Sequence, residues 1–142
     1  MFELDTRLAN DTVVLGDFKQ SRLLLAKDSR YPWCILVPKR VGINEMYQLS
    51  AQEQAQVTKE SALLGQSLMT LYQGDSLNVA ALGNVVAQLH IHHVVRYHND
   101  PCWPGPIWGV GSSVPFEQEE LLKQAKKIIE PLLGQLGFIA VI

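Results

Sequence analysis

The most informative part of the 142-residue sequence is the stretch Gln88-Leu89-His90-Ile91-His92-His93-Val94-Val95-Arg96. Its β-branched and apolar residues predict a β-strand, in which successive side chains point to opposite faces. Gln88, His90 and His92 are therefore expected on one face, and Leu89, Ile91 and His93 on the face that packs against the core. Three hydrogen-bonding side chains in register indicate a functional site more than a solvated surface.

Two imidazoles on one face suit phosphoryl chemistry. Histidine is largely neutral near pH 7, so one ring can attack phosphorus while its neighbour holds or delivers a proton. A histidine nucleophile forms a covalent intermediate and divides one difficult displacement into two easier ones. His90 and His92 are the catalytic candidates, whereas His93 is expected to be a hydrogen-bonded residue of the packing face and His98 a loop residue.

The same spacing would also suit a metal ion. Zinc and iron sites of this kind usually need a third ligand, often a carboxylate, and the nearest acid after the histidines is Asp100, beyond a predicted loop. We therefore expect no metal and no other cofactor, with a metal-dependent hydrolase as the minor alternative.

Two β-hairpins are predicted around this stretch. In the first, strands over residues 22–26 and 33–37 flank the turn-forming segment 27–32. In the second, a strand over residues 76–82 is followed by a turn at Gly83-Asn84 and by a strand over residues 85–96 that carries the histidines.

Two helices are also predicted. Ser50 and Glu53 match a capping box that begins a long helix, and Gly74 is expected to end it in a left-handed conformation. The apolar residues expected on its buried face are Ala55, Ala62, Leu63, Leu68, Met69 and Tyr72. A second helix begins near Pro115 and ends before Gly134, with an apolar stripe of Leu121, Leu122, Ala125, Ile128, Ile129, Leu132 and Leu133. Residues 138–142 are expected to form a last strand or to pack on a partner subunit.

Length and composition predict one domain over residues 1–142, because 47% apolar residues suffice for a single core. A net charge of -2 argues against a surface for a nucleic-acid polymer but permits a small nucleotide. The sequence has no apolar run that could span a bilayer and no apolar secretory segment, so no membrane association and a cytoplasmic location are expected. Cys34 and Cys102 are expected to be free thiols.

At the histidine stretch the sequence resembles the histidine triad (HIT) family. The family signature is His-φ-His-φ-His-φ-φ, with φ apolar, preceded by a Gly-Gln or Gly-Asn segment that contacts phosphate. Gly83-Asn84 and residues 88–94 follow this pattern. The resemblance implies an α+β, HIT-like fold with an antiparallel sheet, one long helix and a C-terminal helix, commonly assembled as a homodimer.

The resemblance also implies a function. The protein would hydrolyse, or transfer, a nucleotide at its α-phosphate, as in a dinucleoside polyphosphate or a nucleoside phosphoramidate. His90 would become nucleotidylated and His92 would lie near the phosphate. Asn84 would contact the phosphate, Asp28 would bond ribose hydroxyls or be an ordinary turn residue, and Asn78 would orient the phosphate or only stabilise the hairpin.

Three positions depart from the family pattern. Gln88 stands at the first triad histidine, His93 at an apolar position, and Trp33 where several members carry a further histidine. A Gln amide cannot exchange a proton near neutral pH, although a backbone carbonyl can still orient the nucleophile. We expect the activity to be retained, and Gln88 is kept as a catalytic candidate; the main alternative is a nucleotide sensor that binds without turnover.

Overall fold

The computed structural model describes residues 1–142, and its six strands form one antiparallel sheet in the order β4-β5-β3-β2-β1-β6. The predicted α+β architecture, with an antiparallel sheet, one long helix and a C-terminal helix, is confirmed. The strands are β1 (Thr12–Asp17), β2 (Ser21–Ala26), β3 (Trp33–Pro38), β4 (Ser76–Ala81), β5 (Ile91–Arg96) and β6 (Ile139–Ala140).

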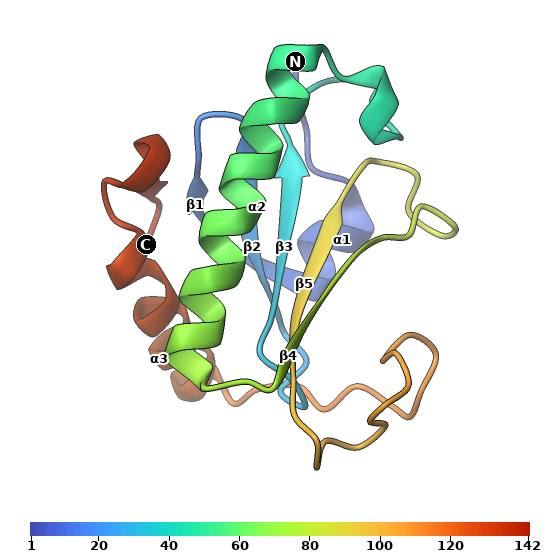
Figure 1. The fold of residues 1–142 in the computed structure, drawn as a ribbon, viewed down its shortest axis with the longest axis vertical. Coiled ribbons are helices and arrows are strands. Elements are labelled where there is room, and N and C mark those ends of the chain that lie inside the picture. The colour runs from blue at the N-terminus through green and yellow to red at the C-terminus, as the bar shows by residue number, and fades with distance from the viewer.

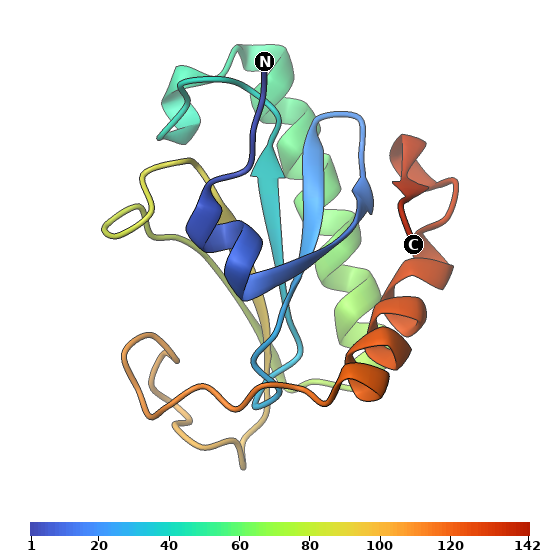
Figure 2. The same ribbon diagram turned by 180° about the vertical axis from the view of Figure 1, so that it is seen from behind.

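Helices lie on both sides of this sheet. The long helix α2 (Ala51–Tyr72) crosses one side with α3 (Gln118–Ile129) next to it (Figure 1), and the short helix α1 (Thr6–Asp11) crosses the other (Figure 2). Three 3₁₀ turns complete the chain: Met46–Gln48, Glu130–Leu132 and Gln135–Gly137. No helix is long and apolar enough to span a membrane.

The main core lies between the sheet and the two longer helices. Leu64 and Leu68 of α2 and Ala125 of α3 pack there against inward side chains of the strands, such as Leu23 and Val95. A smaller apolar cluster under α1 covers the opposite face and is formed by Leu8, Leu24, Ile35 and Val37. Strands covered on both faces explain why their sequences are apolar runs rather than alternating patterns.

The capping box at the start of α2 is confirmed, since the Glu53 amide donates to the Ser50 hydroxyl and the Ser50 amide donates to the Glu53 carboxylate. The prediction that Gly74 ends this helix in a left-handed conformation is wrong, because Gln73 adopts it (φ 52°). Gly74 serves close packing instead, since a Cβ there would collide with Val95.

The predicted apolar faces are partly wrong. On α2, Ala55 and Ala62 are exposed, whereas Val57 and Leu64 are buried. On α3, Leu122 and Leu133 are 39% and 53% exposed. Leu133 lies beyond the end of the regular helix at Ile129, so the helical spacing no longer sets its direction.

The predicted second hairpin also needs correction. The strand β5 begins only at Ile91, and residues 82–90 form an irregular loop that includes Gly83-Asn84. Residues before Ile91 form hydrogen bonds outside the sheet. The Leu89 amide donates to the Ile43 carbonyl, and the Gln88 side chain forms hydrogen bonds with the backbone of the N-terminal segment. The first hairpin and a short last strand, β6 paired with β1, are confirmed. Cys34 and Cys102 are free, as expected.

Candidate functional site

A cavity of about 820 Å³ opens on the α1 side of the sheet, the side that Figure 2 presents. Its walls are α1, the facing ends of β2 and β3, and the loop over residues 107–115. Of the predicted site residues, the cavity brings together His90, His92 and Asp28. Asn84, Asn78 and Gln88 are not among its lining residues, although Val85 and Val86 next to Asn84 are.

His90 lies just before β5, and its ring is held by one backbone contact. Nδ1 of His90 lies 2.7 Å from the carbonyl oxygen of Gln88. Because a carbonyl oxygen only accepts, Nδ1 carries a proton and donates it, so in the neutral ring Nε2 has a free lone pair. The tautomer that a nucleophilic histidine requires is therefore fixed by the backbone.

The Gln88 side chain points away from the histidines. Its Oε1 accepts from the Asp5 amide at 2.8 Å, and its Nε2 donates to the Glu3 carbonyl at 2.8 Å. Both functional atoms of the amide are occupied by the N-terminal segment, so the contribution of this residue to the site is its carbonyl oxygen.

His92 is fixed by a neighbouring strand. The indole Nε1–H of Trp33, the first residue of β3, donates to Nδ1 of His92 at 3.0 Å. The proton of neutral His92 must then be on Nε2. The His90 and His92 rings meet edge to face with centroids 4.9 Å apart, and Trp108 packs on His92 at 4.7 Å.

Burial keeps His92 neutral. Desolvation, followed by the nearby charges of His90 and His93 when protonated, lowers the pKa of His92 to about 4. His93 lies on the opposite face, as predicted, where Nδ1 donates to the Ile91 carbonyl and Nε2 accepts from the Ser61 hydroxyl. Burial lowers the pKa of His93 to about 4 as well. His98 is an exposed loop residue.

These shifts predict a pH-dependent stability. Below about pH 6.5 the unfolded chain protonates His92 and His93, while the folded chain does not until about pH 4. The free energy of unfolding should therefore fall with acidity between these values, by up to about 1.4 kcal/mol per pH unit for each histidine. Urea unfolding at several pH values measures this slope. His92→Asn should reduce this slope, and equal slopes in the wild-type protein and in His92→Asn would contradict the prediction.

Asp28 lies in the turn between β2 and β3 and forms an ion pair with Arg30 (2.8 Å). Burial alone would raise the pKa of Asp28, but hydrogen bonds from Arg30 and from the Val114 amide hold it below its usual value. Arg30 also donates to the Val110 carbonyl. The carboxylate is thus oriented at the cavity wall and ties the β2–β3 turn to the loop over residues 107–115.

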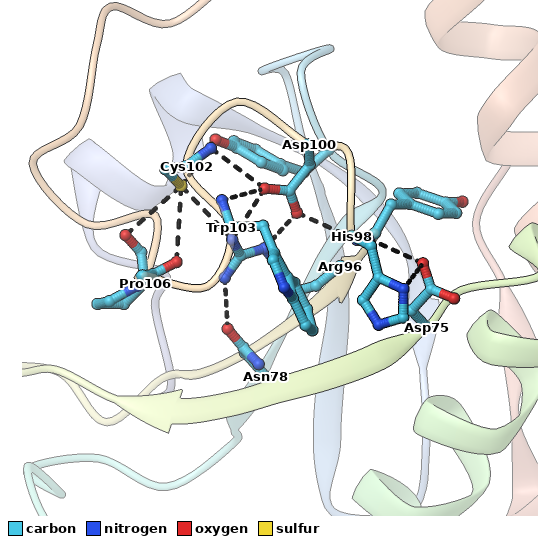
Figure 3. Close-up of polar contacts among 11 residues, drawn as sticks. Asp75, Asn78, Arg96, His98, Asp100, Cys102, Trp103 and Pro106 are labelled. Atoms are coloured by element: carbon cyan, nitrogen blue, oxygen red, sulfur yellow. Dashed lines mark hydrogen bonds and ion pairs between the residues drawn. The ribbon is translucent and has the colours of Figure 1, made fainter.

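Asn78 belongs to a network of polar contacts around Arg96 (Figure 3). Its Oδ1 accepts from Nη1 of Arg96, whose Nε and Nη2 donate to the Asp100 carboxylate at 2.7 and 2.9 Å. The side chains of Arg96 and Asp100 are 1% and 4% exposed. Hydrogen bonds from Arg96 lower the pKa of Asp100 to about 2. These contacts favour the interpretation of Asn78 as a stabilising residue of the hairpin.

The loop that follows this network supplies part of the cavity. Asp100 accepts from the amides of Tyr97, Cys102 and Trp103, which anchors the start of the loop. Further along, Ile107 and Trp108 line the cavity. The contacts of Trp33 and Trp108 with His92 could not be predicted from the sequence, because both depend on how β3 and this loop are placed in the fold.

A metal ion held by His90 and His92 would lack a third protein ligand. No group of three or more His, Cys, Asp or Glu side chains is arranged to hold a metal ion. Asp100, the nearest acid in sequence, is occupied by Arg96.

Known proteins resemble this chain in sequence and in fold. The sequence matches the HIT domain family over residues 7–99. A histidine triad protein from Marinobacter aquaeolei VT8 is 48% identical, with a TM-score of 0.92 over 96% of this chain and 98% of that one. A histidine triad protein from Sinorhizobium meliloti 1021 is 40% identical, with a TM-score of 0.89 over 92% and 96% of the two chains. No curated protein matches the sequence significantly.

A more distant solved structure, the diadenosine triphosphate hydrolase of Plasmodium falciparum, is 15% identical. Its TM-score is 0.65 over 96% of this chain and 83% of that one. At this identity the likeness shows a common fold.

Proposed function

Because the chain belongs to the histidine triad family, we propose that it is a nucleotide-binding hydrolase that acts at a nucleoside α-phosphate through a nucleotidyl-His90 intermediate. The observation that carries the proposal is the free Nε2 of His90 in the cavity, with Nδ1 donating to the Gln88 carbonyl. A phosphoester or phosphoanhydride nucleotide is the substrate class.

In the first step, the Nε2 lone pair of His90 attacks the α-phosphorus and the bond to the leaving group breaks. The Nε2–H of His92, the neighbouring ring, stabilises the negative charge that develops on the phosphate oxygens. The Gln88 carbonyl continues to accept from Nδ1 and so stabilises the positive charge on the nucleotidylated ring. In the second step water attacks phosphorus and releases one proton to solvent, the N–P bond breaks, and its electron pair returns to Nε2.

The rest of the cavity suits a nucleoside. Leu8, Ile35 and Val86 supply an apolar wall for a base, and the Asp28 carboxylate, oriented by Arg30, would bond ribose hydroxyls. Asn84 remains the proposed side-chain contact to phosphate; it is exposed in the loop over residues 82–90 and would approach the substrate from the cavity rim.

The test is to trap the intermediate. Purified protein is incubated with a panel of dinucleoside polyphosphates and nucleoside phosphoramidates, quenched early, and analysed by intact mass. We expect a nucleotidyl adduct with the wild-type protein and with His98→Ala, a control at an exposed loop histidine, and none with His90→Ala. If nucleotide raises the melting temperature but yields neither adduct nor product, the protein is instead a nucleotide sensor that binds without turnover.

We also propose a homodimer, formed through the β4 edge of the sheet. The strand β4 is an edge strand, and beside it lies an apolar groove of about 460 Å³ against α2. Val79 of β4 lines this groove and is 49% exposed. Exposed apolar surface at a strand edge is typical of an interface.

If the dimer forms through β4, a charge on this strand should weaken the association of the subunits. Val79→Asp should raise the dimer dissociation constant by roughly 100-fold or more, because an unpaired carboxylate would be buried between the subunits. Sedimentation velocity over a concentration series measures this constant. Val41→Asp is the control, since Val41 is 63% exposed in a turn after β3. A wild-type protein that is monomeric at high concentration would refute the proposal.

A further inference from the structure

The contacts that fix the two histidines also determine where their protons are. The proton on Nδ1 of His90 is donated to the Gln88 carbonyl. Trp33 is a donor only, and its Nε1–H occupies the Nδ1 lone pair of His92. Neutral His92 therefore holds its single proton on Nε2, and the attacking ring of His90 holds its proton on Nδ1.

A neutral imidazole in this state can donate a hydrogen bond from Nε2 but cannot give that proton away. Losing it would leave an imidazolate unless Nδ1 took up another proton at the same moment, and the indole of Trp33 is not an acid near neutral pH. A protonated His92 could act as an acid, but burial lowers the pKa of His92 to about 4. Protonation at Nδ1 would also break the bond from Trp33.

The neighbouring polar side chains do not replace this missing acid. The Gln88 amide is bonded to Glu3 and Asp5 and cannot exchange a proton. Asp28 is an ion-paired carboxylate whose pKa, which burial would raise, is held low by its hydrogen bonds, and its partner Arg30 stays protonated. The Lys27 ammonium donates to the carbonyl of Asn10.

We propose, resting on the function proposed above, that this site selects leaving groups that depart as stable anions over amines, and that Trp33 is the positioning residue that sets this selectivity. With a nucleoside polyphosphate, the N–P bond to His90 forms, the P–O bond breaks, and the electron pair goes to a phosphate oxygen that needs no proton. With an alkyl phosphoramidate, the P–N bond breaks and the electron pair goes to nitrogen. That nitrogen must gain a proton to leave as an amine, and the site supplies none.

The selectivity is measured with two adenosine substrates, diadenosine tetraphosphate and an adenosine 5′-phosphoramidate of a primary alkylamine. A missing general acid lowers a rate by roughly 10²-fold or more, so kcat/KM for the wild-type protein should favour the polyphosphate by at least that factor at neutral pH. Trp33→His provides a ring that can exchange protons with His92. It should raise the ratio of the phosphoramidate kcat to the polyphosphate kcat by about tenfold or more.

Trp33→Phe tests the same contact by removing the donor. Nδ1 of His92 then becomes free to take up a proton, so phosphoramidate cleavage should rise as the pH falls, a pH limb that the wild-type protein lacks. Trp103→Phe is the matched control, because Trp103 lies outside the cavity lining and packs near His98 and Arg96 (Figure 3). It should keep the wild-type substrate preference.

A readout independent of activity comes from ¹⁵N NMR of the histidine rings. His92 in the wild-type protein and in Trp103→Phe should show an unprotonated Nδ1 and a protonated Nε2, whereas Trp33→Phe should show a mixture of tautomers. Protonated Nδ1 in wild-type His92, or equal cleavage of both substrates, would overturn the inference. Equal nucleotidyl adducts from both substrates would refute the selectivity alone, whereas no adduct from any substrate would refute the proposed function and the selectivity with it.

Discussion

Replacement of His90 by Ala should lower kcat by about 10⁴-fold or more, because it removes the atom that forms the covalent intermediate. Nucleotide affinity should change little, since the apolar wall and Asp28 remain. Steady-state kinetics with a cleavable substrate and equilibrium binding with a non-hydrolysable analogue measure the two quantities separately.

His98→Ala is the matched control for this prediction. His98 is an exposed loop residue whose partner is Asp75, 3.6 Å away, so its loss should leave kcat within about twofold. A His90→Ala protein that retains a tenth of the wild-type kcat would contradict the role of His90 as nucleophile, whatever its affinity for nucleotide.

Replacement of Asp100 by Ala should lower the free energy of unfolding by about 3–5 kcal/mol, because it leaves the buried guanidinium of Arg96 without its carboxylate. The same substitution removes the acceptor for the amides of Cys102 and Trp103 at the start of the loop. Urea unfolding monitored by circular dichroism measures the loss.

Asp17→Ala is the control for the second prediction. Asp17 pairs with Arg22 across partly exposed side chains, 32% and 29% exposed, and an ion pair of this kind contributes up to about 1 kcal/mol. Equal losses in the two variants would show that burial of the Arg96–Asp100 pair adds nothing to its contribution.

The strand faces on which His92 and His93 lie could be predicted from the sequence, because successive side chains of a strand alternate between its two faces. Alternation along a strand is sufficient to separate His92 from His93, and the register of β5 with β3 agrees: His92 pairs with Ile35 of the α1 face, and His93 with Cys34 of the main core. The capping box of α2 is local in the same way.

What could not be predicted depends on contacts between distant segments. The segment before Ile91 leaves the sheet because Leu89 and Gln88 bond residues far away in sequence. The same holds for Trp33 and His92, which meet only once β3 and β5 are paired. From the sequence, Asp100 is predicted only as an alternative metal ligand, because its pairing with Arg96 depends on the folded loop after β5.

The sheet order has a consequence for how the chain folds. The strands β1, β2 and β3 pair through short connections, whereas β5 must close a long loop, past α2 and β4, before it pairs with β3. Closing a long loop loses chain entropy before any contact is gained, so non-local pairing is slow. We expect β1, β2 and β3 to pair early and β5 to pair with β3 late. Because Trp33 lies on β3 and His92 on β5, we expect the hydrogen bond that sets the tautomer of His92 to form only in this late step.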